Sequence, residues 1–242
     1  DGGITDGLFG AGASNSILGF AGPCAINSGG AIGGMAATLN GKAVAVSPVS
    51  ALARSQMLGV LIHELGHALG LGHSQVNLNC LTASASCPSN AAGGDIFGVP
   101  TMFPIALSRT ESTDVHFMTT LAADDISAIS TLYPKQPDFG NSTGTISGIV
   151  FFGDGINHFQ GANVIARRVG DPRVTAISNV SGMFAQVNHG NPALGVSPSP
   201  FGSPDTTKRG QYTIPGLPPG TYTVEVESVR STFTGGSNVG PM

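Results

Sequence analysis

The segment His63-Glu64-Leu65-Gly66-His67-Ala68-Leu69-Gly70-Leu71-Gly72-His73 decides how the rest of the chain is interpreted. On a helix, His63 and His67 share one face a turn apart, so both imidazoles can bind a single ion. Gly70 can leave the helix in a left-handed conformation without steric cost. His73 can then turn back as the third ligand, which leaves zinc a fourth, open position, as in catalytic sites. The segment therefore predicts one catalytic Zn²⁺ held by three histidines.

Glu64 follows the first histidine directly and is not needed as a ligand. A carboxylate beside a zinc ion can take a proton from the water that the metal activates, and can later pass that proton to a leaving amine. The predicted function is therefore a zinc-dependent endopeptidase, which hydrolyses peptide bonds by metal-activated water with Glu64 as the general base.

Hydrophobic periodicity around the segment predicts its local structure. Apolar residues recur at helical spacing from Leu58 to Leu69, and a second helix fits residues 122–132, closed by Pro134. Strands are expected over residues 17–22 and 35–40, ahead of the first helix.

The extended pattern H-E-x-x-H-x-x-G-x-x-H resembles the active-site helix of the metzincins, and among them of the matrixins, the matrix-metalloprotease family. Pro100-Thr101-Met102-Phe103-Pro104 resembles the Met-turn of that family. The resemblance implies that Met102 supports the metal site from below. It also implies that Phe103 and Pro104 form a wall of the substrate pocket.

Two further stretches resemble matrixin elements. Residues 17–23 with residues 33–40 are similar to the edge strand and its neighbour, and residues 121–133 are similar to the last helix. In the family the edge strand binds the substrate backbone in antiparallel fashion. The resemblance therefore assigns substrate binding to Gly19, Phe20 and Ala21.

The chain also departs from the matrixin pattern. Only 62 residues precede His63, so the first strands and the first helix of the family's catalytic domain are expected to be missing. No histidine precedes His63, so the family's structural zinc site is not expected here. Its Ca²⁺ loops cannot be matched residue by residue, and Asp6 is a weak candidate ligand. The segment 74–99 is longer than the family's link to the Met-turn.

The three cysteines leave two readings open. Cys80 and Cys87 can form a short disulfide in an oxidising compartment, or remain two free thiols on a loop. Cys24 has no neighbouring cysteine in the sequence.

The region 144–229 differs from the first half of the chain in its pattern of residues. Short alternating strands separated by frequent turns predict a β-sandwich. Gly216-Leu217-Pro218-Pro219-Gly220-Thr221-Tyr222 resembles the carboxypeptidase regulatory-like, or transthyretin-like, domain. The resemblance implies a stabilising spacer or a weak binding module without chemistry of its own.

The expected fold class is an α+β metzincin catalytic core, with a zinc helix, a C-terminal helix and part of a twisted sheet, plus a separate all-β sandwich domain. Residues 1–134 are expected to form an N-terminally incomplete metalloprotease domain, followed by a linker over residues 135–143. The sandwich is expected over residues 144–229, and a flexible tail over residues 230–242.

Composition limits the classes of partner that the chain is expected to bind. The net charge is −4 and only 10% of the residues are charged, so no basic face for nucleic acid is expected. No apolar run approaches the roughly 18 residues of a membrane span. The chain opens Asp1-Gly2-Gly3 without a signal peptide, so we expect a processed mature chain or an excerpt of a longer one. The expected protein is secreted, monomeric by default, and acts on a protein or peptide substrate.

Two rival functions stay open at this point. One is a non-catalytic secreted surface or adhesion protein, with a degenerate metalloprotease unit and a binding sandwich. The other is a structural module stabilised by zinc, in which a side chain blocks the fourth position. The remaining histidines, His116, His158 and His189, lack ligand spacing and are expected to be ordinary surface or loop residues.

Overall fold

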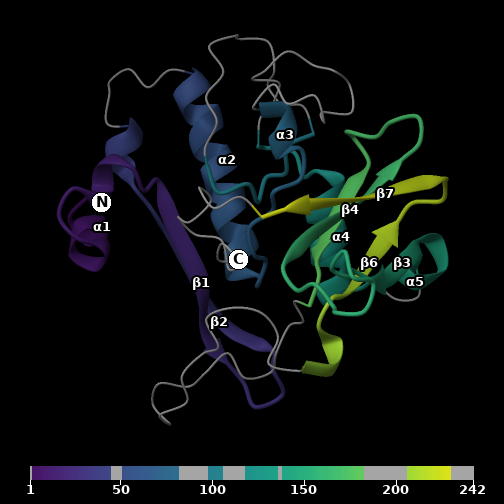
Figure 1. Cartoon of the computed structure of the whole chain (residues 1–242). Coiled ribbons are helices and arrows are strands. Elements are labelled where there is room, and N and C mark those ends of the chain that lie inside the picture. Colours follow the sequence, from purple (N-terminus) through teal and green to yellow (C-terminus); the bar gives the residue numbers. More distant parts are fainter. Residues whose placement is uncertain are drawn as a thin grey trace. The chain divides into compact units, whose positions relative to one another are not determined.

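The computed structural model describes residues 2–44, 51–81, 98–105, 118–135, 138–182 and 206–229. This part of the chain is a mixed α+β structure with small antiparallel sheets, none of which closes into a barrel (Figure 1). The helices are α1 (Gly2–Phe9), α2 (Ala51–Ala68), α3 (Leu78–Leu81), α4 (Ala123–Leu132) and α5 (Asp138–Ser142). The strands are β1 (Gly19–Ile26), β2 (Ile32–Leu39), β3 (Gly144–Ile149), β4 (Ala162–Arg168), β5 (Ala176–Val180), β6 (Gln211–Leu217) and β7 (Tyr222–Ser228). Short 3₁₀ helices span Ala13–Asn15, Gly41–Val44 and Thr206–Lys208.

The chain divides into two compact units. The first unit comprises Asp1–Gly72 and Thr101–Leu121, and the second comprises His73–Pro100 and Ala122–Met242. The predicted domain boundaries after residues 134 and 143 stay a prediction. Within the segment predicted to be a linker, α5 forms a short helix. The tail predicted to be flexible lies outside the described residues.

In the first unit, α2 packs against the hairpin of β1 and β2. Gly19 lies opposite Leu39 at the base of the hairpin, and the antiparallel register shifts at Pro23 and again after Ala25. Proline has no N–H to give to a ladder, so a strand that contains it is confined to an edge or becomes irregular. The two predicted strands are therefore present, but both extend further toward the hairpin tip than expected.

The helix predicted over the first two histidines is confirmed as α2 (Ala51–Ala68), and the predicted left-handed glycine follows it. Gly70 has a φ of 93°. Its N–H donates to the carbonyl of His67, and the N–H of Leu71 donates to the carbonyl of Gly66. This is the hydrogen-bond pattern of a Schellman motif, which satisfies carbonyls at a helix C-terminus and turns the chain back.

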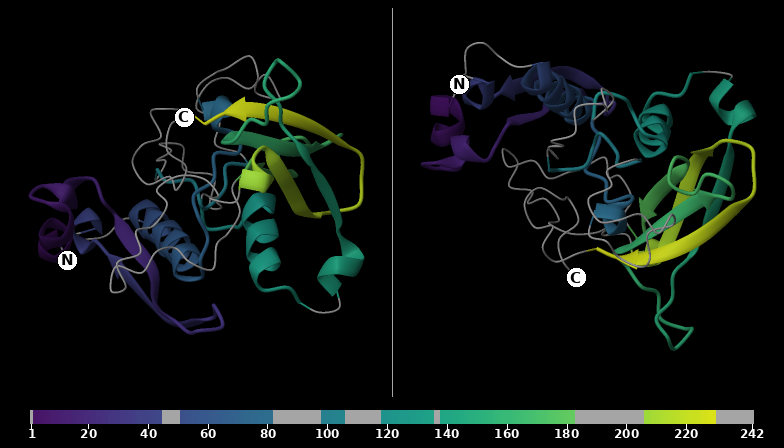
Figure 2. Two further views of the ribbon diagram at one scale, coloured as in Figure 1. Left: turned by 60° about the horizontal axis from the view of Figure 1, so that its bottom comes forward. Right: turned by 90° about the horizontal axis from the view of Figure 1, so that it is seen from above.

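In the second unit, β5, β4 and β7 form one antiparallel sheet, and β3 pairs with β6 in another (Figure 2). The central strand β4 is buried along nearly its whole length. A core cluster combines residues from β4, β5 and β6, namely Val164, Ala166, Ile177, Ile214 and Leu217. The predicted second helix is confirmed as α4, which packs against β5 and β6.

Polar contacts dock α4 onto the strands of the second unit. The Ser127 hydroxyl donates to the Pro215 carbonyl over 2.7 Å. Asp124 accepts hydrogen bonds from the Ser178 N–H and the Ser74 hydroxyl, each over 2.6 Å. The element that the matrixin resemblance assigns to the catalytic core is thus held by residues of the β-sheet unit. None of the described helices combines the length and hydropathy that a membrane span requires.

Candidate metal centre

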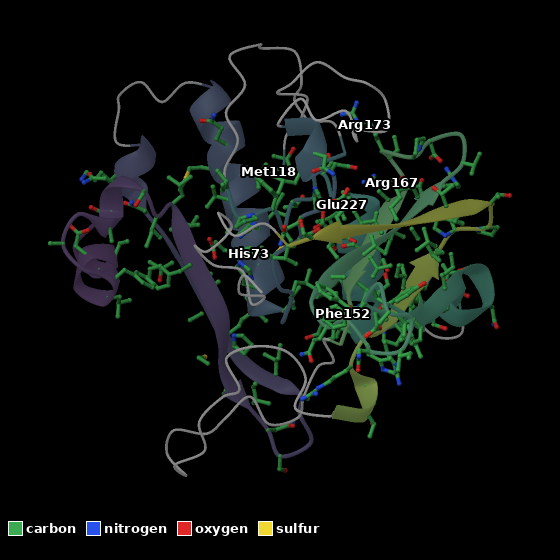
Figure 3. All side chains as sticks on the ribbon, in the orientation of Figure 1. His73, Met118, Phe152, Arg167, Arg173 and Glu227 are labelled. Carbon is green, nitrogen blue, oxygen red and sulfur yellow. The ribbon has the colours of Figure 1, made fainter. Side chains whose placement is uncertain are left out.

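The three predicted histidine ligands come together. His63 and His67 project from successive turns of α2. His73, which is labelled in Figure 3, lies just beyond the Schellman turn. One nitrogen from each ring can be chosen so that all three lie within 4.8 Å of one another. Among the described residues no other group of His, Cys, Asp or Glu side chains has such an arrangement. The cluster is close enough to hold one metal ion.

Backbone carbonyls fix the protonation of two of the rings. Nδ1 of His63 lies 2.7 Å from the Thr101 carbonyl oxygen, and Nδ1 of His67 lies 2.8 Å from the Leu71 carbonyl oxygen. A carbonyl oxygen only accepts, so each Nδ1 carries the proton and each neutral ring keeps its lone pair on Nε2. This is the outer-shell arrangement that orients histidines toward a metal.

The two Nε2 atoms face each other at 3.0 Å. With both Nδ1 atoms protonated, neutral rings would bring two lone pairs together, which is unfavourable unless a cation lies between them. Two nitrogens that bind one tetrahedral zinc ion at about 2.0 to 2.1 Å lie about 3.3 Å apart. The observed separation differs from that value by a few tenths of an ångström, so the donor set fits zinc.

Burial favours the neutral form of the first ligand. The pKa of His63 is lowered to about 4, chiefly by desolvation and to a smaller extent by the neighbouring His67, while the hydrogen bond to Thr101 acts in the opposite direction. A neutral imidazole is the form that binds a metal. His63 therefore offers its lone pair well below neutral pH.

Glu64 is a buried carboxylate on the same helix. It is 4% exposed, and burial raises its pKa to about 7. Its Oε2 atom is buried and has no hydrogen-bond partner among the described residues. An unsatisfied buried carboxylate oxygen is costly and calls for a functional explanation. A proton on a substrate or water molecule would satisfy it.

Gly19 of β1 lies directly against the Glu64 carboxylate. A Cβ atom at position 19 would lie 2.7 Å from Oε1 and 2.8 Å from Cγ of Glu64. These separations are shorter than real Cβ contacts, so only glycine leaves the carboxylate in its observed position. The predicted substrate-binding strand and the predicted general base are therefore in contact.

The predicted substrate-binding residues of β1 lie on a free edge. Gly19, Phe20 and Ala21 are half-buried, and within the described part of the chain β1 pairs with β2 alone. The Phe20 ring makes an edge-to-face contact with Phe9, at a centroid distance of 5.0 Å. One edge of the strand can therefore accept an added backbone.

The predicted Met-turn lies against the helix of the histidines. Met102 and Phe103 are both buried, and Pro104 is half-buried. A Cβ atom at Gly66 would overlap with the sulfur of Met102. The Thr101 hydroxyl donates to the Thr120 carbonyl, which ties the turn to the following segment. Met102 thus supports α2 between the two histidines, while Phe103 belongs to the buried interior.

The remaining predicted residues lie apart from the cluster. Asp6 accepts a hydrogen bond from the Ser14 N–H over 2.7 Å and belongs to no metal-binding group of the described chain. Cys24 is exposed with a free thiol, and His158 is exposed on a hairpin. Cys87, His116 and His189 lie outside the described residues, so the Cys80–Cys87 disulfide stays a prediction.

The polar residues that hold the chain on either side of the cluster could not be predicted from the sequence. Asn77 is buried in a left-handed conformation with a φ of 63°, and it contacts Gly98 and Arg167. Asn enters that conformation more readily than most residues, which is the only local signal. Its partners lie 21 and 90 positions away, so no spacing pattern marks them.

Comparisons of the chain with protein-family models, with curated proteins and with solved structures found no match. The function is therefore inferred from the histidine cluster, its hydrogen bonds and the buried carboxylate.

Proposed function

We propose that this chain is a zinc-dependent endopeptidase of the metzincin type, similar to the matrixins. The observation that carries the proposal is the convergence of three imidazoles, with a neighbouring buried carboxylate whose Oε2 atom has no hydrogen-bond partner among the described residues. Of the side chains that bind metals in proteins, three neutral imidazoles with an adjacent carboxylate that is not itself a ligand are the set typical of a catalytic zinc site.

The residues that would hold the ion are His63, His67 and His73. The Thr101 and Leu71 carbonyls keep the first two rings in the tautomer that leaves Nε2 free. When bound, zinc would supply Lewis-acid chemistry, because it makes water more acidic and polarises a carbonyl group.

Glu64 would move the proton. Its unpartnered Oε2 atom accepts the proton of the attacking water, and the same carboxyl group then donates that proton to the leaving amine. The C–N bond breaks as the amine is protonated, and no covalent intermediate with the protein forms. Gly19 keeps this carboxylate in position because it has no side chain.

The substrate would be a protein or peptide in extended conformation. The free edge of β1 supports this proposal, since an extended backbone can add to an unpaired strand by main-chain hydrogen bonds. Gly19, Phe20 and Ala21 would bind that backbone. By resemblance to the matrixins, Met102 would support the site, and Phe103 with Pro104 would contribute to the pocket.

We also propose that residues 1–134 are an N-terminally incomplete metzincin core, and that residues 144–229 are a carboxypeptidase regulatory-like sandwich of a secreted protein. The buried Met102 against α2 and the two antiparallel sheets of the second unit are consistent with this assignment.

The test compares the zinc-loaded chain with its Glu64→Gln variant on an unfolded protein substrate. The variant keeps all three histidines, so it should bind one zinc per chain while cleavage falls by a factor of about 100 to 10,000. Undiminished cleavage by Glu64→Gln would refute the mechanism. Stoichiometric zinc without any cleavage by the unmodified chain would instead indicate the structural module.

A further inference from the structure

The segment that follows His73 is buried in the β-sheet unit. The Ser74 hydroxyl donates to Asp124, whose other oxygen accepts from the Ser178 N–H of β5. Val76 is 1% exposed and forms a small core cluster with Ile165 and Ala176. The residues directly after the third ligand are therefore held by strands of the second unit.

Asn77 is the hub of this attachment. It is 1% exposed, and every polar atom of its side chain is engaged. Its Nδ2 donates to the Gly98 carbonyl over 2.7 Å and to the Arg173 carbonyl over 3.0 Å. Its Oδ1 accepts from Nη1 of Arg167 over 2.7 Å. A buried amide with all its hydrogen bonds made can adopt one orientation only.

Arg167 of β4 supports Asn77 from within the sheet. The side chain is 1% exposed, and its Nε donates to Glu225 over 2.8 Å. Nη1 also donates to the Pro172 carbonyl, and Nη2 lies 3.8 Å from Glu227 (labelled with Arg167 in Figure 3). Nη2 has no hydrogen-bond partner among the described residues, but the bonds at Nε and Nη1 hold the planar guanidinium in the sheet.

Gly98 completes the attachment on the returning chain. Its φ is 78°, and a Cβ atom there would lie 2.5 Å from the Arg173 carbonyl oxygen and 2.9 Å from Asn77 Nδ2. Only glycine allows this approach. The bond between Asn77 and Gly98 therefore joins the chain that leaves His73 to the chain that returns at Thr101.

Both joined segments lead directly to the metal centre. Asn77 comes four residues after His73, and Gly98 comes three residues before Thr101, whose carbonyl orients His63. Four residues of chain span at most about 14 Å. Ser74, Gln75 and Val76 between the two positions are buried, so a displacement of Asn77 is passed along a short, packed segment toward His73.

We propose that Asn77 and Arg167 are positioning residues of the metal centre, which set the place of His73 through the backbone. The inference rests on the proposed function only in requiring that the three histidines bind a metal. It gives Arg167 of the predicted sandwich a part in placing the third ligand, whereas the sequence predicted a stabilising spacer or a weak binding module without chemistry of its own.

The test is the affinity of the whole chain for Zn²⁺, measured by competition with a chelating indicator. Asn77→Gly removes the side chain, and glycine adopts the left-handed backbone without strain. Any change in affinity therefore reports the loss of the Asn77 hydrogen bonds. We expect a ten- to hundredfold loss of affinity, the size typical of outer-shell changes at metal sites. The Co²⁺ form should show a changed visible spectrum, since the loss or movement of one imidazole alters the ligand field.

The matched control is Ile214→Ala, which removes a fully buried side chain from the other core cluster of the second unit. Affinity should change less than about twofold in this variant, since no outer-shell contact is altered. An equal loss in both variants would show a general structural effect and overturn the inference, as would unchanged affinity in Asn77→Gly.

A double-mutant cycle with His73→Ala tests the route of the coupling. Without the third ligand, Asn77→Gly should cost distinctly less affinity than in the unmodified chain, and full additivity would overturn the proposed action through His73. If Asn77→Gly does not fold, Asn77→Asp takes its place, because it keeps the acceptor for Arg167 and removes both donors. A wild-type chain that binds no metal would refute the proposed metal centre itself.

Discussion

Two glycines determine how close other groups come to the reactive side chains of the first unit. Gly19 leaves room for the Glu64 carboxylate, and Gly66 leaves room for the Met102 sulfur. Neither position has a positive φ, so the requirement is space and not backbone conformation. A single added methyl group at each position therefore tests a separate part of the site.

Gly19→Ala should reduce the rate of peptide cleavage and leave zinc affinity unchanged. The methyl group displaces the Glu64 carboxylate, and a misplacement of about 1 Å can cost about a hundredfold in rate. Steady-state cleavage assays and zinc titration check this result. Gly22→Ala on the same strand is the control, because no heavy atom lies within 4 Å of a Cβ there. Equal rates for the two variants would contradict the contact.

Gly66→Ala should destabilise the first unit by about 1 to 3 kcal/mol, the cost of overpacking a close contact. Urea unfolding followed by circular dichroism measures the loss. Gly7→Ala in α1 is the control, since its Cβ meets nothing within 4 Å, and it should stabilise by about 0.5 to 1 kcal/mol. In a Met102→Ala background the cost of Gly66→Ala should shrink, and an unchanged cost would exclude the sulfur as its cause.

At the scale of elements, α4 buries polar residues and exposes apolar ones. Asp124, Asp125 and Ser127 are buried, whereas Ile126 and Leu132 are about half exposed. Asp125 accepts from the Ala122 N–H at the start of the helix, and Asp124 binds Ser74 and Ser178. The helix is therefore held by hydrogen bonds more than by an apolar face.

The Asp124 carboxyl should make folding stability depend on pH. Burial raises the pKa of this carboxyl to about 6, well above its ordinary value, although hydrogen bonds from Ser74 and Ser178 act in the opposite direction. The folded state therefore binds a proton more tightly than the unfolded state does. Its contribution is fully present below about pH 4 and is lost as pH rises to about 6, a change of about 3 kcal/mol.

Denaturant unfolding of the metal-free chain between pH 4 and 6 checks this prediction. Asp124→Asn should remove the part of the slope that Asp124 contributes, because an amide does not titrate. Glu64, with a pKa raised to about 7, and His63, with a pKa lowered to about 4, contribute slopes of opposite sign, so the quantity compared is the difference in stability between the wild type and Asp124→Asn. Asp154→Asn should leave the slope in place, since Asp154 is exposed and backbone N–H groups of Ile156 and Asn157 lower its pKa. A difference between the wild type and Asp124→Asn that does not fall as pH rises from 4 to 6 would contradict the assignment.

The elements around the histidine segment could be predicted from the sequence, but the buried face of the helix could not. The histidine spacing and Gly70 predicted α2 and its end, because these are local rules of helix geometry. The helical spacing of apolar residues does not indicate which face of α2 is buried, since Leu58 and Leu65 are nearly half exposed while His63 and Glu64 are buried. A functional site places polar groups inside, which reverses the usual pattern.

The contacts around Asn77 could not be predicted for a different reason. They join residues separated by 21 to 96 positions, and each depends on a backbone that only the folded sheets provide. The three clustered histidines lie on one helix and the turn after it, so their geometry follows from the local sequence. The residues proposed to position His73 come from distant parts of the chain.

At the scale of the whole molecule, metal binding should stabilise the chain. An ion that binds only the folded state adds about 4 kcal/mol when its free concentration exceeds Kd about a thousandfold. Unfolding with and without zinc measures the difference. His67→Ala should lose the gain, while His158→Ala should keep it, because His158 lies on an exposed hairpin outside the cluster. Equal gains in both variants would place the bound zinc elsewhere.

The irregular half of β1 has a consequence for the solubility of the molecule. An unpaired strand edge invites the edge of a neighbouring molecule, and natural sheets limit this risk with proline and bulges. Pro23 and the two register shifts beside it interrupt the ladder beyond Gly22. The edge is therefore regular for only a few residues, which is long enough for a short peptide but too short to seed fibril growth between copies of the chain.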